Sequence, residues 1–384
     1  MKRYLRNALL LCLVLLTLCC SCASAELSGF GMVNAGDVAI RKTPGGQRIT
    51  RLQRGTCVWI TGSEADSRGA HWYHVRTQDS DNSNRTGWIS AEFVDAGSAL
   101  WHDIRTVKAA IFGMIALKED GTVLCAGDNM FCGSQNLYAG PRDIRQAGFC
   151  TVGWETWAVD GGGRLFRDGT ACGIKDRIRL AGSSDLVCIT DKNELLVTYE
   201  GDTKIEWVYP QNGAGVQLSR ITAMADCNYR NLFLTEDGQV FCASVDSVAL
   251  DYPEPDWSSW TDAVSIDASL FAYGTQVING RTFRKYVPAF AAVRKDGTVL
   301  AAPAELAALT AGWQEIRKVA VGSDFILGLR QDGTMLAAGT EGRTPPDVSG
   351  WTDITDIANG HTYCVGLKRD GTLVFAGSFE FTDD

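Results

Sequence analysis

The chain of 384 residues lacks the features on which most metalloenzymes and hydrolases depend. It has only four histidines, and after residue 25 it has no Cys-x-x-Cys pair and no Cys/His pair with zinc spacing. His71 and His74 are three residues apart on an expected strand, so they should face opposite sides. No Gly-x-Ser-x-Gly, His-Glu-x-x-His or Cys/His catalytic signature occurs. We therefore expect that the protein binds no metal and no cofactor and that it is not an enzyme.

Positive charge and long apolar runs are also scarce. The formal net charge is −9, and it falls to −12 without residues 1–25, which carry three cations and no acids. Phosphate binding needs a basic face, so the composition argues against a nucleic-acid partner. The longest apolar run, Ala8 to Leu18, is too short to span a bilayer. We expect no transmembrane segment in the mature chain.

Residues 1–25 have the pattern of a secretory signal peptide. A charged start precedes the apolar run, and Ala23-Ser24-Ala25 fits a small-residue cleavage site. The protein is therefore expected to be secreted or associated with the cell surface. The cysteines at 19, 20 and 22 leave a lipoprotein anchor as the alternative.

Nine cysteines follow residue 25, and an odd number leaves at least one unpaired within a monomer. Cys125 and Cys242 align with Ala301 and Ala337 of sibling repeats. This favours buried thiols that act as small apolar side chains, with a disulfide framework as the alternative.

Residues 30–95 predict a small β-barrel of short alternating strands with turns rich in Gly, Ser, Asp and Asn. The expected strands cover residues 38–41, 49–52, 56–60, 71–76 and 87–90. The ordered set Val38-Ala39-Ile40-Arg41-x-x-Pro44-Gly45, Leu52-x-x-Gly55, Trp72-Tyr73-x-Val75 and Gly87-Trp88-Ile89 resembles bacterial Src-homology-3-like domains. Ala39 departs from the family pattern, which usually has Asn there. The resemblance implies binding to cell-wall peptidoglycan, but it identifies no ligand residue.

A hairpin signature, Leu-x-x-Asp-Gly-Thr followed by alternating apolar residues, recurs through residues 101–384. The second turn residue is Gly six times and Asn once, the two residues that best tolerate positive φ. About 42 residues separate successive turns, which suits one small sheet per repeat. The turns are Asp120-Gly121, Gly162-Gly163, Lys192-Asn193, Asp237-Gly238, Asp296-Gly297, Asp332-Gly333 and Asp370-Gly371.

The best repeat, Ile354-x-x-Ile357-Ala358-x-Gly360 continuing to Gly366-Leu367-x-x-Asp370-Gly371-Thr372, resembles the regulator of chromosome condensation family. That resemblance implies a seven-bladed β-propeller over residues 101–384. The Gly-Gln-Leu-Gly segment usual in the family is missing after most hairpins. The expected fold is therefore all-β, with a small Src-homology-3-like barrel followed by seven blades. The segments Leu100 to Ile104 and Ser378 to Phe381 are candidates for closing the ring.

The two ends of each repeat differ in variability. The Asp-Gly hairpins are nearly invariant among the siblings, whereas the loops before the middle strands vary and are rich in aromatic and charged residues, as protein interfaces are. Residues 273–288 add an insertion that predicts a projecting hairpin. The expected partner-binding residues are Phe112, Trp154, Glu155, Asp185, Tyr229, Arg230, Asp324, Phe325, His361 and Tyr363.

These features favour a binding protein whose variable face captures a protein partner. One alternative is a cell-wall hydrolase that uses Glu155, Asp185, Asp324 and His361 as an acid/base set. Others are an enzyme inhibitor, a role known in the resembled propeller family, and a passive spacer.

Overall fold

The computed structural model describes most of the chain after residue 27. Antiparallel strands dominate, and the α-helix among the described residues is α3 (Ala304–Thr310). The all-β fold class is confirmed, whereas the signal-peptide prediction lies outside the described residues. In the described part, no helix is long and apolar enough to cross a membrane. The described ranges are 28–128, 143–150, 155–182, 187–199, 202–204, 209–210, 217–227, 230–244, 255–278, 280–340 and 342–381.

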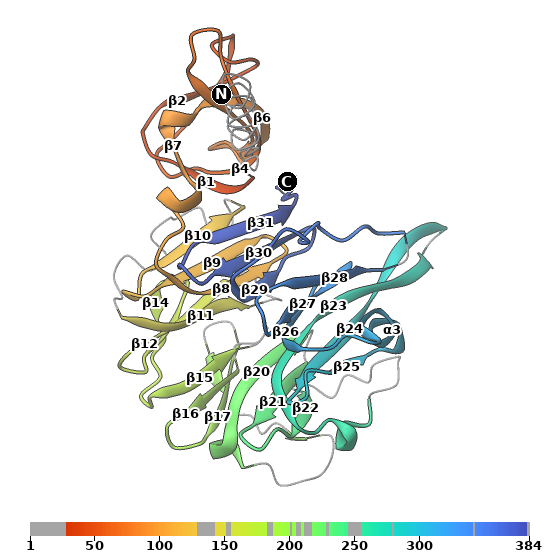
Figure 1. Ribbon diagram of the computed structural model, residues 1–384. Coiled ribbons are helices and arrows are strands. Elements are labelled where there is room, and N and C mark those ends of the chain that lie inside the picture. The colour runs from red at the N-terminus through yellow and green to blue at the C-terminus, as the bar shows by residue number, and fades with distance from the viewer. Residues whose placement is uncertain are drawn as a thin grey trace, which may run out of the picture.

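The N-terminal module, drawn apart from the other sheets in Figure 1, is one antiparallel sheet in the order β3-β2-β6-β5-β4-β1-β7. Buried and less buried side chains alternate along its strands: in β2, Val38 and Ile40 are buried, whereas Arg41 is half-buried. Strands occur at all five expected places, and β1 and β7 are additional. The hydrogen-bonded order is open, with β3 and β7 at its ends. The strands are β1 (Gly29–Val33), β2 (Val38–Arg41), β3 (Arg48–Leu52), β4 (Cys57–Ala65), β5 (His71–Gln78), β6 (Asn84–Ser90) and β7 (Val94–Ala96).

The rest of the described chain forms small antiparallel sheets of three or four strands, seven within the described ranges. They follow one another in chain order around a common centre, which is a propeller-type arrangement (Figure 1). The first three are β8 (Ile104–Ala110), β9 (Gly113–Lys118), β10 (Val123–Gly127); β11 (Ile144–Cys150), β12 (Glu155–Asp160), β13 (Leu165–Arg167), β14 (Thr170–Ala171); and β15 (Ile178–Gly182), β16 (Val187–Thr190), β17 (Leu195–Tyr199), β18 (Asp202–Lys204). The last four are β19 (Tyr209–Pro210), β20 (Ile221–Cys227), β21 (Arg230–Thr235), β22 (Val240–Ser244); β23 (Ala263–Ile278), β24 (Arg281–Arg294), β25 (Val299–Ala302); β26 (Ile316–Val321), β27 (Phe325–Arg330), β28 (Met335–Gly339); and β29 (Ile354–Asn359), β30 (Tyr363–Lys368), β31 (Leu373–Gly377).

Six of the seven hairpin turns, those with glycine, bind the neighbouring sheet. Every turn glycine has a positive φ, as expected, and Asn193 takes the same conformation with φ 61°. In addition, the carbonyl of the turn glycine accepts a hydrogen bond from the first strand of the following sheet. The donor and acceptor pairs are Ile144 to Gly121 (3.3 Å), Ile178 to Gly163 (2.8 Å), Ala263 to Gly238 (2.9 Å), Ile316 to Gly297 (3.0 Å), Ile354 to Gly333 (3.1 Å) and Ile104 to Gly371 (3.0 Å).

The last of these hydrogen bonds closes the ring, because Gly371 belongs to the last sheet and Ile104 to the first. A second contact joins the same two sheets: the Thr106 hydroxyl donates to the Asp356 carboxylate at 3.2 Å. The sequence suggested that residues 100–104 and 378–381 close the ring by contributing strands to one sheet. The structure does not show this pairing between the two segments. Ile104 begins β8 in its own sheet, and no strand is assigned to residues 378–381.

The N-terminal module packs against the junction of the first and last sheets through an aromatic cluster. Phe30 and Trp59 contact Tyr363, Phe375 and Phe379, with ring centroids 4.8–6.1 Å apart. The Trp101 indole N–H donates to the Phe30 carbonyl at 2.7 Å. Phe30 and Trp59 are each 1% exposed. The module and the propeller therefore share one core at the junction between the first and last sheets (Figure 1).

Candidate partner-binding face

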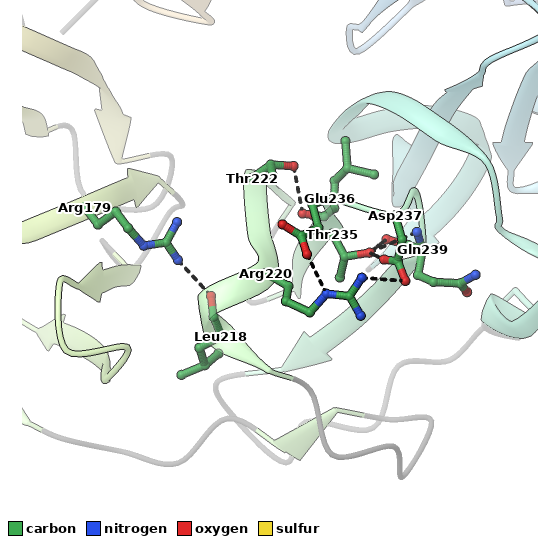
Figure 2. Close-up of polar contacts among 9 residues, drawn as sticks. Arg179, Leu218, Arg220, Thr222, Thr235, Glu236, Asp237 and Gln239 are labelled. Atoms are coloured by element: carbon green, nitrogen blue, oxygen red, sulfur yellow. Dashed lines mark hydrogen bonds and ion pairs between the residues drawn. The ribbon is translucent and has the colours of Figure 1, made fainter.

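The sheets have two different ends, which we call the turn end and the loop end. The turn end carries the Asp-Gly hairpins, and the loop end carries the connections between first and second strands. Contacts within the molecule occupy the turn end, as Figure 2 shows for the fourth sheet. There Arg220 pairs with Glu236 (2.8 Å) and Asp237 (3.1 Å). Arg179 of the third sheet donates to the Leu218 carbonyl at 2.8 Å.

Most of the exposed large apolar side chains outside the module lie at the loop end, three of them on one hairpin. They are Ile111 (44% exposed) between β8 and β9, and Val277 (69%), Phe283 (46%) and Tyr286 (40%) on the long hairpin of β23 and β24. Outside the module, the remaining large apolar side chain with such exposure among the described residues is Val264 (49%), near the turn end of β23. A partner could bury the loop-end group, because nothing in the described chain covers it.

The β23–β24 hairpin extends beyond the rest of its sheet, which confirms the predicted projection. Its strands pair from Ala263↔Arg294 to Ile278↔Arg281, with register shifts between Ala263 and Ser265 and between Ala272 and Thr275. The third strand, β25, pairs only with Phe290–Val293 of β24. The part nearest the tip is therefore a two-stranded ribbon that leaves the sheet (Figure 1).

Asp324 lies at the base of this ribbon, in the loop before β27. Its carboxylate receives a hydrogen bond from the Arg284 guanidinium at 2.6 Å, and Arg343 lies 3.9 Å away. The Asp324 side chain is only 9% exposed, and that of Arg284 is 31% exposed. The paired carboxylate is therefore an anchor for the ribbon, which does not suit the acid/base role considered for it.

Two of the residues expected on the binding face are buried in the core. Phe325 is 3% exposed and packs among residues of the last two sheets. Tyr363 is fully buried; its hydroxyl donates to the Gly113 carbonyl at 2.7 Å, and its ring meets Phe30 and Trp59 of the module. The prediction is wrong for both, because strand alternation turns Phe325 into the core and the docked module covers Tyr363.

Three other expected residues are described and lie near the loop end. Phe112 is half-buried against the core between the first two sheets. Arg230 is 5% exposed at the start of β21. His361 is half-buried, and its shielded Nδ1 has no hydrogen-bond partner among the described residues.

Four expected residues cannot be placed as side chains. Trp154, Asp185 and Tyr229 lie outside the described residues. Glu155 begins β12, where its backbone pairs with Cys150, but its side chain is not described.

Sequence reasoning missed a group of charges on the inner strands. Lys318 of β26 forms an ion pair with Asp356 of β29, and Asp267 of β23 accepts from the Val321 N–H at 2.7 Å. Burial raises the pKa of Asp267. Burial also opposes ionisation of Asp356, but Lys318 outweighs it and lowers the pKa of that carboxyl. Within the described ranges, no cluster of three or more His, Cys, Asp or Glu side chains could hold a metal.

The cysteines follow both of the alternatives left open. Cys57 and Cys364 are buried thiols, and burial raises the pKa of Cys57 to about 12. Cys125 is disulfide-bonded. The prediction from its alignment with Ala301, that it is a free thiol acting as a small apolar side chain, is therefore wrong.

No protein-family model and no curated protein matches the chain. Solved structures with detectable similarity include the CRINKLY WD40 ectodomain of the Arabidopsis thaliana receptor kinase ACR4, with 12% identity over 73% of this chain and 97% of that one, and a TM-score of 0.43. YCF48 from Cyanidioschyzon merolae is 14% identical over 72% of this chain and 96% of its own, with a TM-score of 0.40. Kap60-bound yeast RCC1 is 12% identical over 92% and 79%, with a TM-score of 0.38. The propeller-type arrangement therefore rests on this chain's own sheets and hydrogen bonds.

Proposed function

We propose that the protein is a secreted or cell-surface binding protein whose loop end captures a protein partner. In this proposal the seven sheets are the blades of a propeller of the chromosome-condensation-regulator type. The N-terminal module, residues 30–95, is a Src-homology-3-like barrel that binds the cell wall. An enzyme inhibitor is one form of this function, in which the captured partner is an enzyme.

The observation that carries the proposal is the unequal distribution of exposed apolar side chains. The turn glycines are occupied by contacts to the neighbouring sheets, while Ile111, Val277, Phe283 and Tyr286 remain exposed at the loop end. Three of them lie on the β23–β24 hairpin, and exposed apolar groups gathered in one region are typical of protein interaction sites. Asp324 does not support the hydrolase alternative, because its carboxylate is paired with Arg284.

Strand β23 offers a matched pair of variants, because it carries an exposed valine near each end. Val277→Asp should abolish capture of a partner by the immobilised full chain, since a buried interface anchor is worth about 2 kcal/mol or more. Val264→Asp places the same charge at the turn end and should leave capture unchanged. Equal capture by wild type and Val277→Asp would remove the loop end from the proposal.

The cell-wall role requires the full chain as its test. Phe30 and Trp59 of the module are buried against the propeller, so a module cut free would expose them to water. The full chain should sediment with purified peptidoglycan sacculi and should be displaced by soluble wall fragments. Recovery in the supernatant would contradict the anchoring role, while leaving the loop-end proposal intact.

A further inference from the structure

The outer part of the β23–β24 hairpin, residues 275–286, is here called the ribbon tip. Strand β25 reaches only Phe290–Val293, so within the described residues no third strand pairs with the ribbon tip. Its outer backbone edge can accept a further strand, because edge N–H and C=O groups remain available there.

Alternation gives the two faces of the ribbon tip different chemistry. Arg281, Phe283 and Lys285 occupy alternate positions on β24 and therefore share one face. Arg284 lies on the other face, where it is fixed by Asp324. The first face thus presents a cation, an exposed aromatic ring and a second cation along one strand.

The charge of the ribbon tip is opposite to that of the protein. Residues 273–288 contain three cations and no acids, although the whole chain has a net charge of −9. Asp324 neutralises Arg284, whereas Arg281 and Lys285 form no ion pair within the described ranges. Two unpaired cations beside a 46%-exposed Phe283 are a basic, apolar feature on an acidic molecule.

We propose that the ribbon tip binds an extended acidic segment of a partner protein, a proposal that rests on the loop end being the binding face. Alternate side chains on one face of a strand are about 7 Å apart. An extended segment with an acid–apolar–acid pattern at alternate positions would place its carboxylates on Arg281 and Lys285 and its apolar side chain on Phe283.

An anionic membrane and a nucleic acid fit the ribbon tip less well. Both present dense negative charge over a wide area, so the acidic body would be repelled as the tip approached. Two available cations are also few for a phosphate polymer, whose affinity comes from many neutralised phosphates. A local acidic strand avoids both problems.

The test uses the full chain and a synthetic peptide in which glutamate alternates with valine and phenylalanine. Arg281→Glu/Lys285→Glu should weaken peptide binding about tenfold or more, because the two ion pairs, one at exposed Arg281 and one at half-buried Lys285, are replaced by repulsion. Lys368→Glu/Arg369→Glu makes the same change in net charge beside a hairpin turn and should bind like wild type. Added salt should weaken the wild-type complex.

Three results would overturn the proposal. They are equal affinity for a peptide with glutamine in place of glutamate, tighter binding to phosphatidylglycerol vesicles or to oligothymidylate than to the acidic peptide, and no binding to the acidic peptide at all. Comparison with Val277→Asp separates the two proposals. If Val277→Asp loses capture of the natural partner and the charge reversal does not, the binding face stands and the acidic-segment inference fails.

Discussion

At the scale of single residues, the glycine of each Asp-Gly turn meets two requirements at once. It adopts positive φ, and its carbonyl binds the first strand of the next sheet. A turn that only reversed the chain would need the first property alone. The neighbouring sheet approaches so closely that a side chain at this position would meet backbone atoms, which explains why glycine fills it in six of the seven turns.

Gly121→Ala tests this double requirement. An added Cβ would lie 2.7 Å from the Asp143 Cα and the Ile144 nitrogen, at a φ of +80°. We expect a loss of about 3 kcal/mol in the free energy of unfolding, from left-handed strain together with the clash. Gly342→Ala is the control, because it has a φ of +74° with open space around it and should cost only about 1 kcal/mol. Equal losses in urea denaturation would show that the contact between sheets contributes nothing.

The Cys57 thiol gives a second prediction at this scale. Burial raises its pKa from 9.0 to about 12, so the folded protein retains the proton where the unfolded chain loses it. Its contribution to stability is complete below pH 9.0 and falls as the pH rises toward 12. Iodoacetamide at pH about 8 should label Cys57 in denaturant but not in the native protein, because the thiolate is the reactive form. Equal labelling rates by mass spectrometry would contradict its burial.

At the scale of elements, the sequence predicted the strands and turns, because these features depend on residues that are close together in the chain. Alternation and turn residues located five module strands, all seven repeat hairpins and the projecting insertion. It missed β1, whose Gly29–Val33 segment is buried on both faces and so does not alternate. It could not pair Arg284 with Asp324, which are 40 residues apart. It also placed Tyr363 on the binding face, because nothing local shows that another module covers it.

The Arg284–Asp324 pair should hold the ribbon in place. Arg284→Ala leaves the nearly buried Asp324 carboxylate at the ribbon base with only the 3.9 Å contact to Arg343. A loss of about 1.4 kcal/mol, modest for a hydrogen bond to a charged group, would raise the population of opened ribbon about tenfold. Tryptic cleavage after Arg281 should accelerate accordingly. Arg343→Ala removes only the longer 3.9 Å contact and should leave the cleavage rate close to wild type.

At the scale of the whole molecule, ring closure depends on contacts that a repeat pattern cannot reveal. The last turn binds the first sheet through Gly371 and Ile104, as every other turn glycine binds its successor. The N-terminal module then adds an aromatic core over the same junction. The module, for which the sequence suggested only cell-wall binding, therefore packs over the junction at which the ring closes.

Trp59→Ala tests this packing. Trp59 is 1% exposed and contacts Tyr363, Phe375 and Phe379, so its truncation should cost about 3–5 kcal/mol. Because module and propeller share this core, we expect one cooperative thermal transition for wild type and two for the variant. Trp88→Ala truncates the same residue type inside the module, where the ring contacts His74 at a tilted angle and is not among the residues of the shared core. It should lower stability without splitting the transition. A single transition in the Trp59 variant, followed by calorimetry and near-ultraviolet dichroism, would mean that the ring holds together without the module.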